Sequence, residues 1–351
     1  MTARLVLCFD GTWNKPDEEH RPEEQVETNV RRFHEAALAA GPDGTHQIKW
    51  YSAGVGTKWD ERLRGGALGY GIDQIIRNGY EFLVTNHAEG DEIFVLGFSR
   101  GAYAARSLVG MLRKTGLVND LDFVSAAYEL YRDRDDTPDS PKATAFRDAN
   151  ARAVRVKFLG VWDTVGALGI PASAFDILKI PGLAVFDREK YQFHDTGLSG
   201  IVENAYHAVA IDEHREEFQP TLWTPPFRPN QTVEQRWFIG AHCDVGGGYR
   251  ERELSDLGLA WMMDKAAGCG LALASAHRPQ PKADAAARGV LHDSFADFLG
   301  AAGKILSIFK HPYFRPLTLG SDNRQKMDES VNARFTGNPD YRPKNQGFPL
   351  H

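Results

Sequence analysis

The sequence predicts a doubly wound α/β fold built on a mainly parallel sheet. Three observations lead to this prediction. Apolar runs recur along the chain, amphipathic segments separate them, and polar residues follow the ends of several runs. Strands covered by helices on both faces read as continuous apolar runs, and strands that alternate with helices pair in parallel.

The expected elements follow in order along the chain. We expect strands at residues 4–10, 48–53, 92–98, 154–163, 206–211 and 236–241. Most are continuous runs of Val, Ile, Leu and Phe, as expected for strands that are buried on both faces. Helical patterns occupy residues 25–39, 67–86, 102–114, 121–132 and 254–267.

The chain length of 351 residues suits one large α/β domain, residues 1–351, with insertions. Residues 133–150 are polar and charged, which predicts a solvated insertion. Residues 167–187 are apolar and contain prolines, so they could form a lid over a site or a piece of core. Residues 311–351 are rich in Pro, Asn and Arg, which favours a tail that wraps the surface without regular structure.

The composition disfavours two classes of protein. The formal net charge of −6 argues against nucleic acid as the main partner and gives no default attraction to anionic lipid. No stretch has the length of uncharged apolar residues that a membrane span needs, so any contact with a membrane would be peripheral. A small molecule or a lipid ester is the expected kind of substrate.

The N-terminus and the cysteines indicate the compartment. Residues 1–10 become acidic too soon for a signal peptide and read as a buried first strand. Cys8, Cys243 and Cys269 are widely spaced and fit neither a disulfide framework nor a metal site. We therefore expect a cytoplasmic protein, which leaves export by a signal-independent route open. No immunity or secretion partner follows from the sequence.

The segment Gly97-Phe98-Ser99-Arg100-Gly101 has the context of a nucleophile elbow. It follows an apolar run that ends at Leu96 and precedes an amphipathic stretch, in a Gly-x-Ser-x-Gly pattern. A strand, a tight turn and a helix in this order expose the serine hydroxyl at the turn. The alternative is a serine that caps the helix. The placement favours Ser99 as a nucleophile and the fold as α/β-hydrolase-like.

A serine nucleophile needs an imidazole base and a carboxylate that orients it. In open parallel sheets, ligands bind beyond the carboxyl ends of the strands, where Asp163 and His242 each follow an expected strand. The chain order Ser, Asp, His is the order that hydrolases with this elbow use. We therefore predict a triad of Ser99, Asp163 and His242.

A competing assignment uses Asp244 as the acid and His292 as the base. It would place acid and base after the last strands of the sheet. We favour Asp163 and His242, because His242 directly follows an expected strand.

Two N–H groups are needed to bind the oxyanion of a tetrahedral intermediate. The Arg100 N–H supplies one, and the loop with Gly11 and Thr12, which follows an early strand, is the candidate for the other. Further residues at the same edge could line a pocket: Asp10, Trp13, Trp162 and Thr164.

Metal chemistry is the main rival reading. Asp10, Asp163 and Asp244 are all expected at one sheet edge, where they could hold a divalent cation for phosphoester cleavage. His207, Asp212 and His214 lack a recognisable ligand spacing. The leading prediction therefore uses no metal and no cofactor.

Five motifs together resemble a known family: Phe9 to Asn14, Thr28 to Val30, Gly97 to Ala102, Val161 to Gly166 and His242 to Tyr249. They are similar to the α/β-hydrolase domain family that includes bacterial type VI secretion phospholipase effectors. The resemblance implies a Ser-Asp-His triad, with Ser99, Asp163 and His242 at the matching positions, and hydrolysis of glycerophospholipid acyl esters. The secreted effectors carry large additional membrane-associating regions, and this chain holds little beyond the hydrolase domain.

These observations predict a serine ester hydrolase of the lipase or phospholipase type. A metal-assisted phosphoesterase and a non-catalytic homologue that binds a lipid or a protein are the alternatives.

Overall fold

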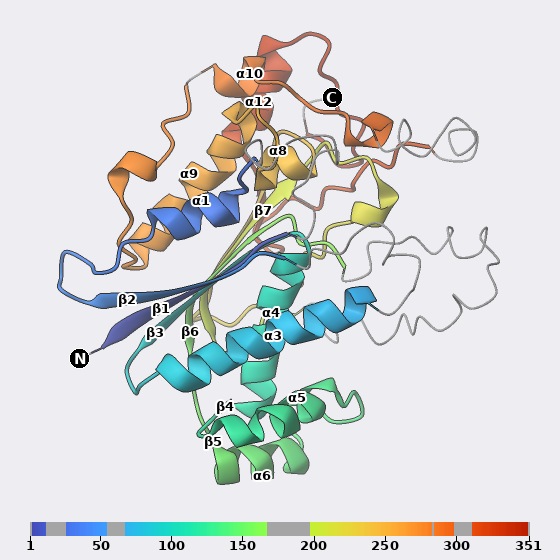
Figure 1. Cartoon of the computed structure of the whole chain (residues 1–351). Coiled ribbons are helices and arrows are strands. Elements are labelled where there is room, and N and C mark those ends of the chain that lie inside the picture. The colour runs from blue at the N-terminus through green and yellow to red at the C-terminus, as the bar shows by residue number, and fades with distance from the viewer. Residues whose placement is uncertain are drawn as a thin grey trace.

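A parallel sheet runs through the centre of the molecule, with helices on both faces (Figure 1). The structure is a computed structural model, and it describes residues 2–11, 26–54, 67–166, 197–282, 284–297 and 311–349. Within these residues the sheet has seven strands in the order β2-β1-β3-β6-β7-β8-β9, and every neighbouring pair is parallel. The predicted doubly wound parallel fold is confirmed.

The strands of this sheet are β1 (Ala3–Phe9), β2 (His46–Ser52), β3 (Glu92–Phe98), β6 (Val156–Trp162), β7 (Val202–Ala210), β8 (Thr232–Phe238) and β9 (Gln325–Met327). The α-helices are α1 (Asn29–Ala36), α3 (Ala67–Asn86), α4 (Arg100–Thr115), α5 (Val124–Arg132), α6 (Pro141–Asn150), α8 (His242–Gly246), α9 (Glu253–Gly268), α10 (Ala285–Arg288) and α12 (Glu329–Gly337). The described residues also form shorter elements: β4 (Leu117–Val118), which pairs with β5 (Ala151–Arg152), and 3₁₀ turns at Leu121–Phe123, Glu216–Phe218 and Ser275–His277.

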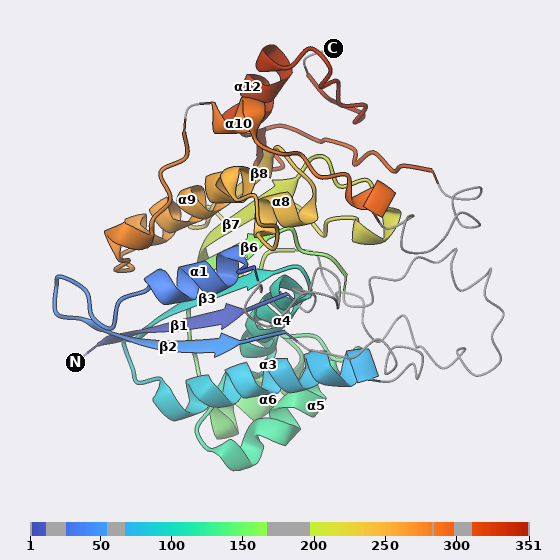
Figure 2. The ribbon, with the colours of Figure 1, turned by 45° about the horizontal axis from the view of Figure 1, so that its top comes forward.

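The helices form a layer on each face of the sheet. Figures 1 and 2 show α3 and α4 on one side and α1 and α9 on the other. Alternate residues of β1 divide between the two layers: Leu5 and Leu7 pack with α3 and α4, and Val6 and Cys8 pack with α1 and α9. This alternation explains why the strands read as continuous apolar runs, since both faces are buried.

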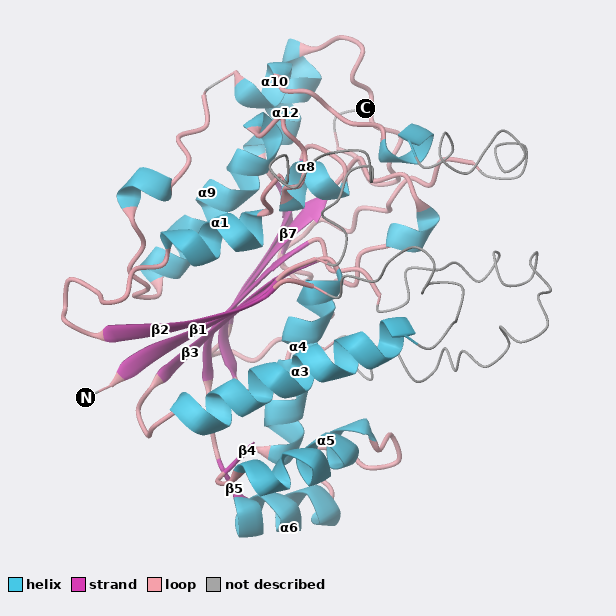
Figure 3. Ribbon diagram, in the orientation of Figure 1, coloured by secondary structure: helices cyan, strands magenta, loops and turns pink. Residues whose placement is uncertain are grey.

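The carboxyl ends of the strands meet along one edge of the sheet, which Figure 3 shows beside the start of α4. The chain passes from β1 outward to β2 and then returns to β3 on the other side of β1. Strand order therefore reverses between β1 and β3, at the place where doubly wound sheets bind ligands. Ser99 follows β3 directly at this point.

Two glycines allow β3, α4 and β1 to approach closely. A Cβ on Gly97 would lie 2.6 Å from the carbonyl oxygen of Gly101, and a Cβ on Gly101 would collide with the carbonyl oxygen of Phe9. Only glycine fits at either position. The two glycines of the Gly-x-Ser-x-Gly pattern thus set the packing of the turn that carries Ser99.

The C-terminal stretch is more deeply integrated than the sequence predicts. Residues 311–349 add β9 to the sheet, form α12, and place Arg315 in the interior with no exposed surface. A surface tail without regular structure is therefore the wrong description. Residues 133–150 form a polar turn and α6, while the predicted lid at 167–187 lies outside the described residues.

Candidate functional site

Ser99 lies at a strained turn between β3 and α4. Its φ of 58° and ψ of −123° are uncommon for a residue other than glycine. Its N–H donates to the Trp162 carbonyl oxygen at 3.1 Å, which ties the turn to the neighbouring strand β6. The side chain makes no capping hydrogen bond to the helix, so the helix-cap reading of this serine is not supported.

Asp163 follows β6, the strand beside β3. It has a φ of 37°, and its N–H donates to the Ala208 carbonyl oxygen at 2.7 Å. Its carboxylate has no exposed surface, and its Oδ1 accepts from the Ala210 N–H at 3.0 Å. The next strand, β7, therefore holds the carboxylate in place.

His242 begins α8, four residues beyond the end of β8. Its Nδ1 lies 2.6 Å from Asp163 Oδ2. The imidazole packs against two aromatic rings, with centroids 4.6 Å from Phe98 and 4.9 Å from Phe218. Because Phe98 immediately precedes Ser99, the structure brings the three predicted triad residues to one part of the sheet edge.

Arg315 is a site residue that sequence reasoning missed. Its guanidinium forms two bonds with the Asp163 carboxylate, Nη1 to Oδ1 at 2.7 Å and Nη2 to Oδ2 at 3.0 Å. The same group donates to the carbonyl oxygens of Ala210, at 2.6 Å, and Phe218. Arg315 lies in a stretch without a motif or a periodic pattern, so the sequence carries no signal that places it beside Asp163.

A second buried carboxylate, Glu213, accepts a hydrogen bond from the backbone at His242. Its Oε2 accepts from the His242 N–H at 3.2 Å and from Ser294 Oγ at 2.9 Å. Arg215 pairs with both of its oxygens at 2.8 Å and stacks over Phe218. Each of the two carboxylates near His242 therefore has its own guanidinium partner.

The electrostatics of the site follow from burial and from these pairs. Burial alone would raise the pKa of Asp163, but the Arg315 charge and the His242 hydrogen bond hold it well below its usual range. Burial would likewise raise the pKa of Glu213, and its bonds with Arg215 bring that pKa to about 2. Burial lowers the pKa of His242, and the Asp163 hydrogen bond opposes this effect.

The competing pair also forms a hydrogen bond. His292 Nδ1 lies 2.7 Å from Asp244 Oδ1, and its Nε2 lies 3.5 Å from Glu251. The His292 ring stacks on Tyr249, with centroids 3.7 Å apart. Asp244 also accepts from the Ala241 N–H at 3.0 Å, so this pair braces the turn that carries His242. Among the described ring contacts, the His242 ring packs against Phe98, the residue beside Ser99, whereas the His292 ring packs against Tyr249.

The turn after β1 lies beside Ser99. A Cβ on Gly11 would stand 3.5 Å from Ser99 Cβ. The Gly11 N–H, a predicted oxyanion donor, donates to Asp10 Oδ1 at 2.7 Å in this structure. Asp10 Oδ2 accepts from Thr28 Oγ1 at 2.7 Å and from the Tyr51 hydroxyl at 2.5 Å. Asp10 therefore orders this loop rather than facing the nucleophile with a free charge.

The other predicted site residues divide into two groups. Trp162 and Thr164 have no exposed surface. Trp162 packs against Phe33 beneath α1, and the Thr164 N–H donates to His207 Nε2 at 3.1 Å. Both therefore belong to the interior and not to the wall of an open pocket. Arg100 is the first residue of α4, which begins two residues before the expected start at residue 102, and Thr12 and Trp13 lie outside the described residues.

In the part of the chain that the structure describes, the carboxylates at this edge are not arranged as a metal site. Among the described residues, no group of three or more His, Cys, Asp or Glu side chains could hold a metal ion. Asp10, Asp163 and Asp244 instead direct their oxygens at separate N–H, O–H and guanidinium donors. This arrangement gives no support to the cation-binding alternative.

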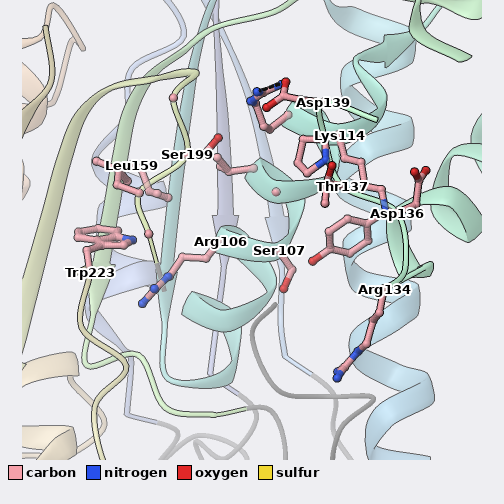
Figure 4. Close-up of a pocket in the computed structure, with 18 of the residues that line it drawn as sticks. Arg106, Ser107, Lys114, Arg134, Asp136, Thr137, Asp139, Leu159, Ser199 and Trp223 are labelled. Atoms are coloured by element: carbon pink, nitrogen blue, oxygen red, sulfur yellow. Dashed lines mark hydrogen bonds and ion pairs between the residues drawn. The ribbon is translucent and has the colours of Figure 1, made fainter. Parts of the chain in front are cut away.

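A cavity of about 570 Å³ lies along α4 (Figure 4). It is bordered by α4, the turn at residues 133–139 and residues 197–200. In Figure 4, Arg106 points toward Trp223, whose ring centroid lies 5.1 Å from the guanidinium carbon. Ser99, Asp163 and His242 do not line this cavity.

Of the helices described, none combines the length and the apolar character that crossing a membrane requires.

Comparison with known proteins identifies relatives over most of the chain. The model of a family described as "T6SS, Phospholipase effector Tle1-like, catalytic domain" matches residues 3–265. The "Uncharacterized protein YEL023C" of Saccharomyces cerevisiae is 30% identical over 252 residues, which are 64% of this chain and 33% of that protein. This chain therefore spans about a third of that relative's length.

Solved structures show weaker likeness. An uncharacterized protein from Pseudomonas aeruginosa has a TM-score of 0.44 at 18% identity, over 89% of this chain and 51% of that one. A Tle1 effector, solved bound to the VgrG spike of the type 6 secretion system, has a TM-score of 0.40 at 19% identity. That match covers 71% of this chain and 52% of the effector. Because the family model covers about three quarters of the sequence, the chain belongs to the family of Tle1-like phospholipase effector catalytic domains.

Proposed function

We propose that this chain is a serine ester hydrolase that cleaves acyl esters of lipids, with Ser99 as nucleophile, His242 as base and Asp163 as orienting acid. The observation that carries the proposal is the 2.6 Å contact between His242 Nδ1 and Asp163, on an imidazole that packs against Phe98 beside Ser99. A nucleophile, a base and a group that orients the base are the three parts that this chemistry needs.

In the proposed reaction, Ser99 Oγ attacks the carbonyl carbon of the ester while His242 Nε2 takes the hydroxyl proton. The carboxylate of Asp163 accepts from Nδ1–H, which selects the tautomer with a free Nε2. The tetrahedral intermediate collapses, and His242 returns the proton to the leaving alcohol. Water then attacks the acyl-enzyme, with His242 again acting as base, and releases the acid and free Ser99.

The negative oxygen of the intermediate needs donors that already point at it. The N–H of Arg100 stands at the first position of α4, where the helix dipole favours negative charge. The second donor in this proposal comes from the loop at Gly11 and Thr12. In this structure the Gly11 N–H donates to Asp10, so it must turn toward the oxyanion or leave that role to Thr12.

For the substrate class we propose glycerophospholipids, because the family is described as phospholipase effectors. The proposal concerns this chain alone, since it spans only part of the length of its relatives. It assigns neither a carrier protein nor a target cell.

The test combines a covalent probe with two substrate sets. A fluorophosphonate should label the folded protein and not its Ser99→Ala variant. Ser107→Ala is the matched control, because Ser107 is a buried serine on α4, the helix that Ser99 precedes. Chromogenic acyl esters of rising chain length and phospholipid vesicles, assayed for released fatty acid, then define the substrate.

Each outcome has a consequence. Loss of labelling and of fatty-acid release in Ser99→Ala, with both retained in Ser107→Ala, supports the whole proposal. Hydrolysis of chromogenic esters without fatty-acid release retains the mechanism and overturns the phospholipid substrate. Ester hydrolysis that survives Ser99→Ala rejects the mechanism. Turnover of phosphodiesters that a chelator abolishes, with acyl esters untouched, would replace it by metal-assisted phosphoester cleavage.

A further inference from the structure

We infer that Arg315, from the C-terminal segment, is a positioning residue of the active site that fixes Asp163 and keeps His242 uncharged and ready to act as a base. The inference rests on the proposed function, and it adds a residue beyond 3–265, the region that the family model matches. The C-terminal segment, residues 311–349, therefore contributes a residue to the proposed active site.

The geometry of the contact carries the inference. Arg315 and Asp163 both have side chains with no exposed surface, and two parallel bonds of 2.7 and 3.0 Å join them. Such a two-pronged bond fixes the plane of a carboxylate as well as its position. Asp163 Oδ2 is the oxygen that contacts His242 Nδ1, so the plane that Arg315 sets also sets the direction of the imidazole.

The rest of the segment anchors Arg315 at the strand ends. Asn345 Nδ2 donates to the carbonyl oxygens of Ile211, at 3.1 Å, and of Arg315 itself, at 3.0 Å. The Tyr341 hydroxyl lies 3.0 and 3.1 Å from the two carboxylate oxygens of Asp212. Asp212 in turn accepts from the Gly240 N–H at 2.8 Å, in the turn that leads to His242. The segment thus connects the ends of β7 and β8 around the site.

The charges around His242 explain what Arg315 does. The charged groups that face it are Asp163, Glu213, Arg215 and, through Asp163, Arg315, while Cys243 and Asp244 lie on its own helix. Glu213 and Asp163 are each matched by a guanidinium, from Arg215 and Arg315. Among the described residues, removing Arg315 would leave Asp163 buried with His242 as its one cationic partner, and the pair would draw a proton onto the imidazole. A protonated imidazole cannot accept the Ser99 proton.

The experiment measures the His242 pKa directly, by the ring-proton NMR shifts of the Ser99→Ala protein between pH 4 and 9. We expect Arg315→Met to raise that pKa by about one unit or more, and Arg315→Lys, which keeps the charge, to leave it nearly unchanged. Arg334→Met is the matched control. It removes another buried guanidinium of the same segment, whose bonds go to the carbonyl oxygens of Ala286 and Gly289. It should not move the His242 pKa.

Kinetics of Arg315 variants that retain Ser99 separate the positioning role of Arg315 from its effect on charge. Arg315→Lys loses the two-pronged bond, so kcat should fall at least tenfold while KM and the pH profile stay close to those of the parent. A native kcat in Arg315→Lys overturns the positioning role. An unshifted His242 pKa in folded Arg315→Met overturns the charge role. If Arg315→Met does not fold, Arg315→Gln takes its place in the titration.

The titration also separates this inference from the proposed function. It is read on the resting protein, without a substrate. A shifted His242 pKa in a protein that hydrolyses no ester would support the Arg315 contact and reject the esterase. Ester hydrolysis with an unshifted His242 pKa would support the esterase and reject the charge role of Arg315.

Discussion

Asp163 is shared between His242 and Arg315: its Oδ2 lies 2.6 Å from His242 Nδ1 and 3.0 Å from Arg315 Nη2. The aspartate that we propose to orient His242 also belongs to a fully buried ion pair. Burial opposes ionisation of a carboxylate, and the guanidinium overcomes that cost, so Asp163 stays charged in a dry environment. The catalytic and structural roles of this residue should therefore be separable by mutation.

Replacing Asp163 by Asn should abolish activity and destabilise the protein together. We expect kcat to fall roughly 10³- to 10⁴-fold, because the wrong imidazole tautomer is favoured. The free energy of unfolding should fall by about 3–5 kcal/mol, because Arg315 is left buried without its carboxylate. The double variant Asp163→Asn/Arg315→Met should recover most of that stability and none of the activity. Urea unfolding and initial rates on a chromogenic ester measure the two effects, and additive losses of stability in the double variant would contradict this account.

The strained backbone at Ser99 predicts that glycine is tolerated better than alanine at this position. Its φ of 58° with ψ of −123° is readily adopted by glycine and costs other residues about 1–3 kcal/mol. Ser99→Gly and Ser99→Ala should both be inactive. Ser99→Gly should be the more stable of the two by about 1 kcal/mol, even though glycine usually destabilises. Chemical denaturation of the two variants measures the difference, and a more stable Ser99→Ala would show that the turn is not strained.

Much of this site could be predicted from the sequence because its residues follow strands. Ser99 and Asp163 come directly after buried apolar runs, and His242 comes four residues after the observed end of β8. Parallel strands bring their carboxyl ends to one edge, so position in the chain predicts proximity in space. The sequence favours one of the two His–Asp pairs because His242 directly follows an expected strand, whereas His292 follows none. In the structure both pairs form hydrogen bonds.

Arg315 and β9 could not be predicted for a physical reason. Gln325–Met327 is a strand of three residues, of which Lys326 is exposed, so it lacks the apolar run that reveals the other strands. An arginine in a stretch rich in proline and asparagine normally indicates a segment that is exposed to solvent. Here a carboxylate far away in the sequence compensates its charge, and that pairing exists only in the folded chain.

The pH dependence of activity should reflect the environment of His242. Burial lowers its pKa below the ordinary 6.5 despite the Asp163 hydrogen bond, and the base must be neutral to act. The acid limb of kcat/KM should therefore have its midpoint below pH 6.5, and activity should persist where an exposed histidine is half protonated. A profile of kcat/KM between pH 4.5 and 9 on a soluble ester checks this. A midpoint above 6.5 would mean that Asp163 outweighs burial.

His292 should affect stability more than catalysis. We expect His292→Gln to retain activity within about tenfold of the parent, because its ring stacks on Tyr249 while His242 contacts the residue beside Ser99. The matched change His242→Gln should abolish activity. Steady-state rates of the two variants decide between the two predicted triads. Loss of activity in His292→Gln with His242→Gln active would favour Asp244 and His292.

The two histidines should also give stability opposite slopes with pH. The hydrogen bond with Asp244 raises the pKa of His292, so its contribution is fully present below pH 6.5 and is lost as pH rises through the raised value. The pKa of His242 is lowered, so the folded protein loses stability as pH falls below 6.5, where the unfolded chain binds a proton first. Unfolding free energies from pH 5 to 9 should therefore show His292→Gln closest to the parent at high pH. His242→Gln should instead remove part of the parent's loss of stability in acid. Parallel curves for the parent and His292→Gln would mean that the Asp244–His292 pair has the same proton affinity in the folded and unfolded chains.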